Sequence, residues 1–354
     1  MHCACCIVPN DVLRRLGQDQ NLSDEARQAL TRTALIDQEL RNFREQARQF
    51  TVVMQSISPT LAPIAAAPAV TVYDCNHTQT TPGVPVPNPG NAADPSAKNA
   101  FVEATAVAQF YQTVFGRNSI DNAGMTILSS IHFGVRYNNA MWNGTQMLYG
   151  DGDGQIFIDF TNGNDVIGHE LTHGVTQHTL QLIYADEAGG LNESLSDVFG
   201  SMFRQWQANQ TVSAADWLIG KDIMGPAAKA RGLTCLRDMT NPAAAHCLAP
   251  QPTHYSQYQP GMDPHYSSGI PNLAFYTFAA ALADPNFPNP QPAYARSWQT
   301  AGQIWYRAMI TGSASPNMTM HDFANRTVAA AAQLYPAVPA ISNALQAAWA
   351  KVGV

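Results

Sequence analysis

The chain has 354 residues, of which 45% are hydrophobic and 13% charged, so it is long enough for a large core and two domains. Its net charge of −7 arises after residue 50, because the first 50 residues balance seven Arg against seven acidic residues. The sequence lacks clusters of Lys and Arg that neutralise phosphates, which excludes a nucleic-acid partner. It also lacks the run of about 20 apolar residues that a membrane-spanning helix needs, so no membrane partner is expected. Residues 1–9 show no secretory signal, and we expect a cytoplasmic protein or one secreted by a non-standard route.

The first 70 residues predict a helical unit followed by a linker. Apolar residues three or four positions apart, such as Leu13 with Leu16 and Ile36 with Leu40, predict helix over residues 11–48. Residues 51–70 are rich in Pro, Ala and Val, which favours an unstructured linker. This stretch is either an inter-domain linker or a junction at which a protease separates residues 1–50 from the rest, since exposed junctions are where proteases cut.

After the linker, the sequence predicts short strands and one helix up to about residue 165 and a mostly helical pattern from there to residue 354. An apolar stripe predicts a helix over residues 97–115. Short strand-like runs separated by turn residues are Val70–Asp74, Met125–Val135, Met147–Tyr149 and Gln155–Phe160. The Asp-rich stretch Asp151–Gly154 predicts a turn rather than a calcium loop, because the downstream Glu of an EF-hand is missing.

The segment His169-Glu170-Leu171-Thr172-His173 indicates a metal site. On a helix, His169 and His173 lie one turn apart on one face, which is the spacing that lets two imidazoles bind one zinc ion. Glu170 lies beside them, where a carboxylate can accept a proton from metal-bound water. The alternative is a surface helix that carries two His by chance.

A second helical pattern, over residues 191–206, supplies the remaining groups of such a site. Glu193 and Asp197 are four residues apart and therefore share a helical face. Glu193 would complete a coordination by two His and one Glu, and water would take the open position. Asp197 would accept the second ring N–H of a ligand His. An ordinary solvated face explains the pair less well, because the helix is otherwise strongly apolar.

Together these motifs resemble the thermolysin family of zinc metallopeptidases, of the gluzincin type. The likeness extends from about residue 70 to the C-terminus and includes the runs Tyr137–Ala140, Tyr149–Gly154, Leu182–Tyr184, Leu236-Arg237, Ser268–Ile270 and Val352–Val354. The residues before the linker, with Ile7-Val8-Pro9 followed by Leu13-Arg14-Arg15, are similar to the short pro-segment of the protealysin subgroup. The resemblance implies a two-lobed α+β fold, with an N-terminal α/β lobe over residues 71–180 and a C-terminal, mainly helical lobe over residues 181–354. The zinc-site helix would lie between the lobes, and a small helical pro-segment would precede them.

The resemblance also assigns the catalytic centre. It implies one catalytic Zn²⁺ held by His169, His173 and Glu193, with Glu170 as general base and later proton donor. It places Asn192 beside Asp197 as a residue behind the ligands. It makes His265 and Tyr184 hydrogen-bond donors to the oxyanion, a role that suits donors placed where charge develops; without the family, packed or surface side chains would be the better interpretation of both.

The same resemblance implies how peptide substrates bind. Asn139 and Ala140 would align the peptide main chain, and Arg237 would bind a substrate carbonyl, with an ordinary ion pair as the alternative. Four apolar residues would line the pocket for the residue after the scissile bond, although core packing explains them nearly as well: Phe157, Val166, Ile219 and Leu236.

Some positions depart from the family pattern. Asp263 precedes His265 by only two residues, closer than the acidic residue that orients this His in the family, so their pairing stays open. Met141 stands before Trp142 where the family often has an aromatic residue, so contacts at the substrate edge are expected to differ. Arg204, Leu218 and Lys221 occupy positions where carboxylates of a double calcium site are expected. We therefore predict that this Ca²⁺ site is absent, with ion pairs in its place.

The six Cys define no disulfide framework. Cys235 and Cys247 are close enough in sequence for a disulfide across a loop. Cys3, Cys5 and Cys6 either supply a thiolate that blocks the zinc of the precursor or are free thiols on a tail.

Overall, the sequence predicts the precursor of a zinc-dependent endopeptidase. It would hydrolyse peptide or protein substrates with Glu170-activated, zinc-bound water, would prefer apolar residues after the scissile bond, and would be inhibited by its own pro-segment. The alternatives are a zinc-bound protein without activity, which would not need Glu170, and an exopeptidase on the same zinc core.

Overall fold

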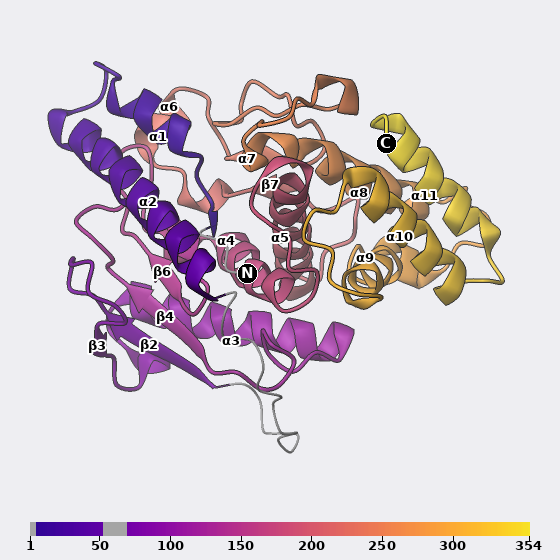
Figure 1. Ribbon diagram of the computed structural model, residues 1–354, viewed down its shortest axis with the longest axis horizontal. Coiled ribbons are helices and arrows are strands. Elements are labelled where there is room, and N and C mark those ends of the chain that lie inside the picture. Colours follow the sequence, from indigo (N-terminus) through magenta and orange to yellow (C-terminus); the bar gives the residue numbers. More distant parts are fainter. Residues whose placement is uncertain (1–4, 52–68) are drawn as a thin grey trace.

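The computed structural model describes residues 5–51 and 69–354, without the side chains of residues 5 and 43–51. The N-terminal segment, residues 5–51, holds helices α1 (Asn10–Gly17) and α2 (Asp24–Thr51), which pack against each other (Figure 1). The single helical stretch expected over residues 11–48 is therefore broken. Ser23 begins the second helix, because its Oγ accepts a hydrogen bond from the backbone N–H of Ala26 at 3.2 Å. The expected cleavage junction falls mostly on residues 52–68, outside the described residues.

A six-stranded sheet forms the core of the first lobe in the order β1-β5-β6-β4-β2-β3. The strands β2, β4 and β6 run parallel, and β1, β3 and β5 are antiparallel to their neighbours. Helix α3 (Pro95–Phe115) covers one face of the sheet (Figure 1). The strand bounds are β1 Cys5–Cys6, β2 Val70–Asp74, β3 Val84–Pro85, β4 Ile127–Ile131, β5 Ala140–Trp142 and β6 Met147–Tyr149.

The strand expected at Gln155–Phe160 is wrong. Only an isolated bridge forms there, between Phe157 and Met224. The carboxylate of Asp153 accepts hydrogen bonds from the backbone N–H groups of Gln155 and Ile156, at 2.6 and 2.7 Å. Such a local side-chain acceptor competes for the donors that a strand ladder would need.

Helices α4 (Asn164–Gln177) and α5 (Asp186–Gln207) cross closely at the centre of the molecule. A Cβ added to Gly200 would lie 2.6 Å from the carbonyl oxygen of Asp165 and 3.0 Å from the backbone nitrogen of His169. Only glycine permits this separation, and the close approach brings the acidic face of α5 to the two His of α4.

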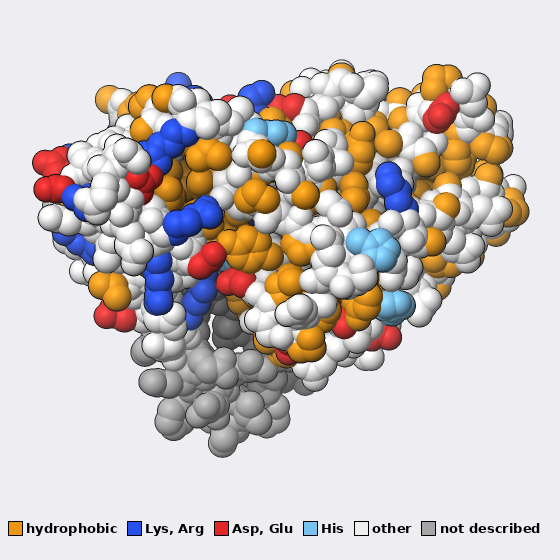
Figure 2. All heavy atoms as spheres, turned by 90° about the horizontal axis from the view of Figure 1, so that it is seen from above, with side chains coloured by type: hydrophobic (Ala, Val, Ile, Leu, Met, Phe, Trp, Pro, Cys, Tyr) orange, Lys and Arg blue, Asp and Glu red, His pale blue; other side chains and the backbone are white. Residues whose placement is uncertain are grey.

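The second lobe is helical, as expected. Its short strands are β7 (Leu218–Ile219) and β8 (Arg237–Asp238), and its helices are α6 Pro226–Ala230, α7 Pro264–Ser267, α8 Gly269–Ala283, α9 Thr300–Ile310, α10 Met320–Leu334 and α11 Pro339–Lys351. No helix among the described residues is long and apolar enough to cross a membrane. Figure 2 shows the molecule from above. Charged side chains gather on its left, where α1 and α2 lie, and are sparse on its right, over the C-terminal helices.

Candidate active site

The three expected zinc ligands meet where α4 and α5 cross. The Nε2 atoms of His169 and His173 lie 3.0 Å apart, and each lies 3.4 Å from a carboxylate oxygen of Glu193. Ligand atoms at about 2.0–2.1 Å from one tetrahedral zinc ion are separated by about 3.3 Å. All three side chains are buried. Their donor atoms therefore have the spacing of a single zinc site.

Two residues of α5 orient the His rings from behind. Nδ1 of His169 lies 2.8 Å from Oδ1 of Asp197, and Nδ1 of His173 lies 2.9 Å from Oδ1 of Asn192. These contacts turn the two Nε2 atoms toward each other. Asp197 and Asn192 thus lie where the sequence placed them.

The protonation of the three groups also suits a metal. Burial lowers the pKa of His173 to about 3, so this ring is neutral as a ligand must be. Burial opposes ionisation of Glu193, but the neighbouring His265 and His173 bring its pKa well below the usual value. Oε2 of Glu193 is buried and has no hydrogen-bond partner among the described residues. A buried carboxylate oxygen left unpartnered is the place where a cation fits.

The carboxylate of Glu170 faces the same centre, and one of its two oxygens is hydrogen-bonded while the other has no hydrogen-bond partner among the described residues. Its Oε2 accepts a hydrogen bond of 2.7 Å from the backbone N–H of Trp142 on β5. Its Oε1 has no hydrogen-bond partner among the described residues. Burial raises the pKa of Glu170 well above its usual value. The carboxylate is therefore fixed in position and suited to hold a proton.

His265 is oriented by Asp263, which answers the question that the sequence left open. Nδ1 of His265 lies 2.7 Å from Oδ1 of Asp263, at the start of α7. Burial alone would lower the pKa of His265, but the carboxylates of Glu193 and Asp263 raise it. The hydroxyl of Tyr184 lies 3.2 Å from Nε2 of His265 and donates to Oε1 of Glu193 at 2.5 Å.

The N-terminal segment lies across this centre as an added strand. Cys6 of β1 pairs with Met141 of β5, in antiparallel register. The carbonyl oxygen of Cys6 lies 2.5 Å from Nε2 of His265, and the backbone N–H of Ile7 donates to the carbonyl of Ala140 at 3.2 Å. The main chain of Cys6 and Ile7 therefore contacts both the predicted oxyanion donor, His265, and the backbone of β5 at Ala140.

The next contacts engage two further residues that the sequence predicts to bind substrate, Asn139 and Arg237. The side-chain amide of Asn139 accepts from the N–H of Val8 at 2.9 Å and donates to its carbonyl at 3.1 Å. Nη1 of Arg237 donates to the carbonyl of Ile7 at 3.0 Å. The same guanidinium holds Asp197 through two hydrogen bonds of 2.7 and 2.8 Å. Arg237 thus forms a buried bidentate ion pair with Asp197 and also binds a peptide carbonyl, that of Ile7. The ion-pair and the carbonyl-binding interpretations of the sequence therefore both describe this residue.

Two contacts of the N-terminal segment were missed in the sequence. Asp37 on α2 accepts hydrogen bonds from the hydroxyl of Tyr137 and, at 2.9 Å, from Nδ2 of Asn139. Burial raises the pKa of Asp37 to about 6. The only signal was an acidic residue next to Ile36 on the apolar stripe of a helix. The second missed contact is that of Arg41, whose guanidinium donates a hydrogen bond of 3.6 Å to the thiol of Cys6.

The described thiol of Cys6 therefore contacts Arg41, and its carbonyl, not its sulfur, meets His265. Cys3 and the side chain of Cys5 lie outside the described residues.

Comparison with known proteins decides the family. Residues 40–177 match the model of the thermolysin metallopeptidase catalytic domain, and residues 180–354 match that of its alpha-helical domain. The chain belongs to the thermolysin family of metallopeptidases. It is a metalloendopeptidase, and zinc is the metal of this family.

The similar proteins include two bacterial proteases and the solved structure of one precursor. An "Extracellular metalloprotease" from Pectobacterium carotovorum is 34% identical over 99% of this chain and 96% of the relative. "Protease PrtS" from Photorhabdus is 36% identical over 80% of this chain and 76% of the relative. The solved structure of the "Precursor of Protealysin" from Serratia proteamaculans has a TM-score of 0.78 and 33% identity, with 99% of this chain and 100% of that chain covered.

The apolar residues expected to line the thermolysin-type pocket are all fully buried. They belong to one hydrophobic cluster, which also contains Ile7 and Val8 of the N-terminal segment: Phe157, Val166, Ile219 and Leu236. Their burial fits both the pocket and the core interpretation.

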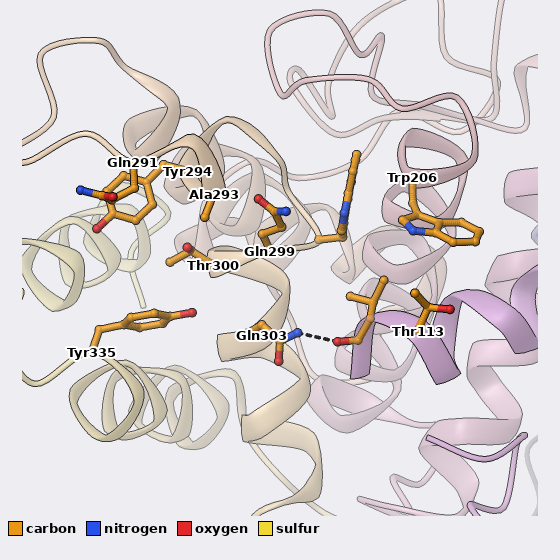
Figure 3. A pocket seen from close by; sticks show the side chains of 11 residues that line it. Thr113, Trp206, Gln291, Ala293, Tyr294, Gln299, Thr300, Gln303 and Tyr335 are labelled. Atoms are coloured by element: carbon orange, nitrogen blue, oxygen red, sulfur yellow. Dashed lines mark hydrogen bonds between the residues drawn. The ribbon is translucent and has the colours of Figure 1, made fainter. Parts of the chain in front are cut away.

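A separate open pocket of about 590 Å³ lies between the C-terminal end of α3, α5 and the segment before α9 (Figure 3). Aromatic and amide side chains line it, among them Trp206, Tyr294 and Tyr335. Nε2 of Gln303 at its edge donates to the carbonyl of Val114 at 2.7 Å. None of its lining residues is a predicted site residue.

Proposed function

We propose that this chain is the precursor of a zinc endopeptidase that its own N-terminal residues 1–50, the pro-segment, keep inactive. The observation that carries the proposal is the main chain of residues 6–8, which bonds to the groups expected to bind substrate: His265, Ala140, Arg237 and Asn139. A peptide substrate would need the same hydrogen bonds. It therefore competes directly with the pro-segment.

His169, His173 and Glu193 would hold the zinc ion. When bound, zinc polarises a peptide carbonyl and makes a coordinated water acidic enough to lose a proton near neutral pH. The rest of the chemistry falls to side chains of this chain.

Glu170 would move the proton. Its unpartnered Oε1 would accept a proton from the attacking water, and its raised pKa suits it to keep that proton until the peptide nitrogen leaves. The hydrogen bond from Trp142 holds the other oxygen in place throughout.

His265 and Tyr184 would stabilise the negative charge that develops on the carbonyl oxygen. Support comes from the carbonyl of Cys6, which already lies 2.5 Å from Nε2 of His265. The carboxylate of Asp263 raises the pKa of this imidazole and so favours its donor form. Tyr184 would exchange its bond with Glu193 for the oxyanion.

Specificity would follow from the apolar cluster. Phe157, Val166 and Leu236 are fully buried beside the site and would favour an apolar residue after the scissile bond. The Pectobacterium relative is named an extracellular metalloprotease, which supports the proposal that the mature enzyme acts outside the cell.

Glu170→Ala tests the proposal. Hydrolysis of a peptide blocked at both ends should fall at least about 1000-fold, because the proton acceptor is gone. Zinc content should remain near one equivalent at the catalytic site, since the three ligands are intact. Cleavage of the doubly blocked peptide by the mature wild-type enzyme separates an endopeptidase from an exopeptidase.

Glu103→Ala is the matched control, because Glu103 lies on α3 and bonds only to Gln207 among the described residues. It should leave hydrolysis unchanged. A Glu170→Ala enzyme that still cleaves the peptide at the wild-type rate would overturn the mechanism.

A further inference from the structure

Three metal-ligating side chains outside the catalytic centre meet in the second lobe. Cys235 and Cys247 form an isolated parallel bridge at the two ends of an eleven-residue loop. Backbone hydrogen bonds join the ends, from Thr234 N–H to the carbonyl of His246 at 3.0 Å and from Leu248 N–H to the carbonyl of Cys235 at 2.9 Å. These backbone hydrogen bonds therefore fix the positions of the two cysteines relative to each other.

The separation of the sulfurs is the first sign of a metal site. Sγ of Cys235 lies 3.8 Å from Sγ of Cys247, and both residues are buried. Two thiolates bound at about 2.3 Å to one tetrahedral zinc ion lie about 3.8 Å apart. A disulfide would hold the sulfurs at about 2.0 Å. The spacing is too long for a disulfide bond, and it matches a shared ion as well as it matches a hydrogen bond between two thiols.

His246 supplies a third ligand. A nitrogen of its ring and the two sulfurs all lie within 4.8 Å of one another. Its Nε2 lies 3.2 Å from Oδ2 of Asp238, and Asp238 is itself buried and anchored through Oδ1 by Thr240 and Asn241. A carboxylate in contact with a ligating imidazole is the usual second partner of zinc-bound His. A disulfide would need neither the ring nor the carboxylate.

We propose that Cys235, Cys247 and His246 form a second metal site that takes a soft divalent ion of the Zn²⁺ type. Two sulfurs and one imidazole are the ligand set that such an ion prefers over Ca²⁺ or Mg²⁺. The site does not depend on the proposed peptidase function.

The consequence concerns Arg237, which follows Cys235 by two residues. Arg237 binds both Asp197 and the carbonyl of Ile7. An ion that joins the ends of the loop would fix the backbone of β8, and with it the guanidinium that holds a peptide in the cleft. The second metal would be structural, since its ligands do not touch the catalytic residues.

Cobalt substitution tests the site in the full chain. The Glu170→Ala variant, which cannot digest itself, is reduced, stripped of metal and titrated with Co²⁺. We expect two equivalents to bind, with near-ultraviolet thiolate-to-cobalt absorption, because the catalytic ligands offer only nitrogen and oxygen. Cys235→Ser and Cys247→Ser should each lose or strongly weaken this absorption. Cys6→Ser, which removes a described thiol on the segment that lies across the catalytic centre, and Cys75→Ser, which removes another buried thiol, should keep it.

A second measurement does not depend on whether the variants fold. Alkylation of the unmutated thiols, read by mass spectrometry of peptides, should be slower at Cys235 and Cys247 with zinc than after chelation, while Cys75 should react equally in both. Absence of thiolate-to-cobalt absorption in the reduced chain would overturn the proposal. So would a purified protein in which the two Cys are joined by a disulfide and bind no metal after reduction.

Discussion

At the scale of single residues, Asp37 makes the docking of the pro-segment depend on pH. This carboxyl is fully buried against Tyr137 and Asn139, and burial raises its pKa from 3.8 to about 6. The docked form therefore binds a proton more tightly than the undocked chain does. Its stability is greatest below about pH 4, falls as the pH rises toward 6 and is constant above that, a change of about 3 kcal/mol. Tyr137 donates a hydrogen bond to this carboxyl, the cationic groups that act on it are Arg41 and His265, and the buried thiol of Cys6 also lies near it.

Asp37→Asn should remove this dependence. In the Glu170→Ala background, the free energy of denaturant unfolding would be measured at pH 4 and pH 6.5 for the chain with and without the change. We expect the Asp37→Asn variant to gain about 2–3 kcal/mol relative to its parent between the two pH values. Glu39→Gln, at an exposed position of α2, is the control and should follow the parent. Parallel pH curves for the Asp37→Asn variant and its parent would show that the carboxyl does not titrate in this range.

At the scale of elements, β1 and the two residues after it are the part of the pro-segment that lies across the catalytic centre, and main-chain hydrogen bonds hold them. The N–H of Val8 donates to the buried amide oxygen of Asn139 at 2.9 Å. Val8→Pro removes this donor, and the loss of a buried hydrogen bond costs about 1–3 kcal/mol. The uncut precursor should therefore hydrolyse a blocked peptide roughly tenfold faster than the wild-type precursor.

The matched control is Val8→Ile, which keeps the N–H and the apolar side chain. It should stay as inactive as the wild-type precursor. Inhibition that survives Val8→Pro would mean that α1 and α2, rather than the main chain in the cleft, block the substrate. Mass spectrometry during the assay confirms that the precursor is uncut.

The contrast between the expected zinc ligands and the main chain of residues 6–8 shows what a sequence can predict. His169, His173, Glu193 and Asp197 were predictable because four-residue spacing on a helix fixes which side chains share a face. The family likeness placed His265 and Arg237. The contact of Val8 with Asn139 joins residues 131 positions apart, and no local spacing encodes it. Local rules also failed where a side chain diverts backbone donors, as at Asp153.

At the scale of the whole molecule, the chain has few charged residues, but three acidic side chains cluster where the thermolysin pattern has calcium ions. Arg and Lys side chains lie among these carboxylates. Nη2 of Arg204 lies 3.0 Å from Asp222 and 3.9 Å from Asp216, and Nη1 lies 3.7 Å from the buried carboxylate of Asp165. Lys221 adds a contact of 2.9 Å to Asp216. Burial opposes the charge of Arg204, yet the three carboxylates raise its pKa. Two fixed cations therefore already balance the carboxylates that a calcium ion would need.

This arrangement predicts a stability that does not depend on calcium until the cation is removed. The melting temperature of the wild-type chain should be the same with and without a calcium-selective chelator, at constant zinc. Arg204→Met leaves Asp165 and Asp222 without their cationic partner, while Lys221 still pairs with Asp216, and should lower the free energy of unfolding by about 2 kcal/mol. Millimolar Ca²⁺ should restore part of this loss, because the variant recreates an oxygen-rich acidic site. Lys98→Met, at an exposed position of α3, is the control and should show neither effect. A wild-type melting temperature that falls in the chelator would show that calcium binds despite the two cations.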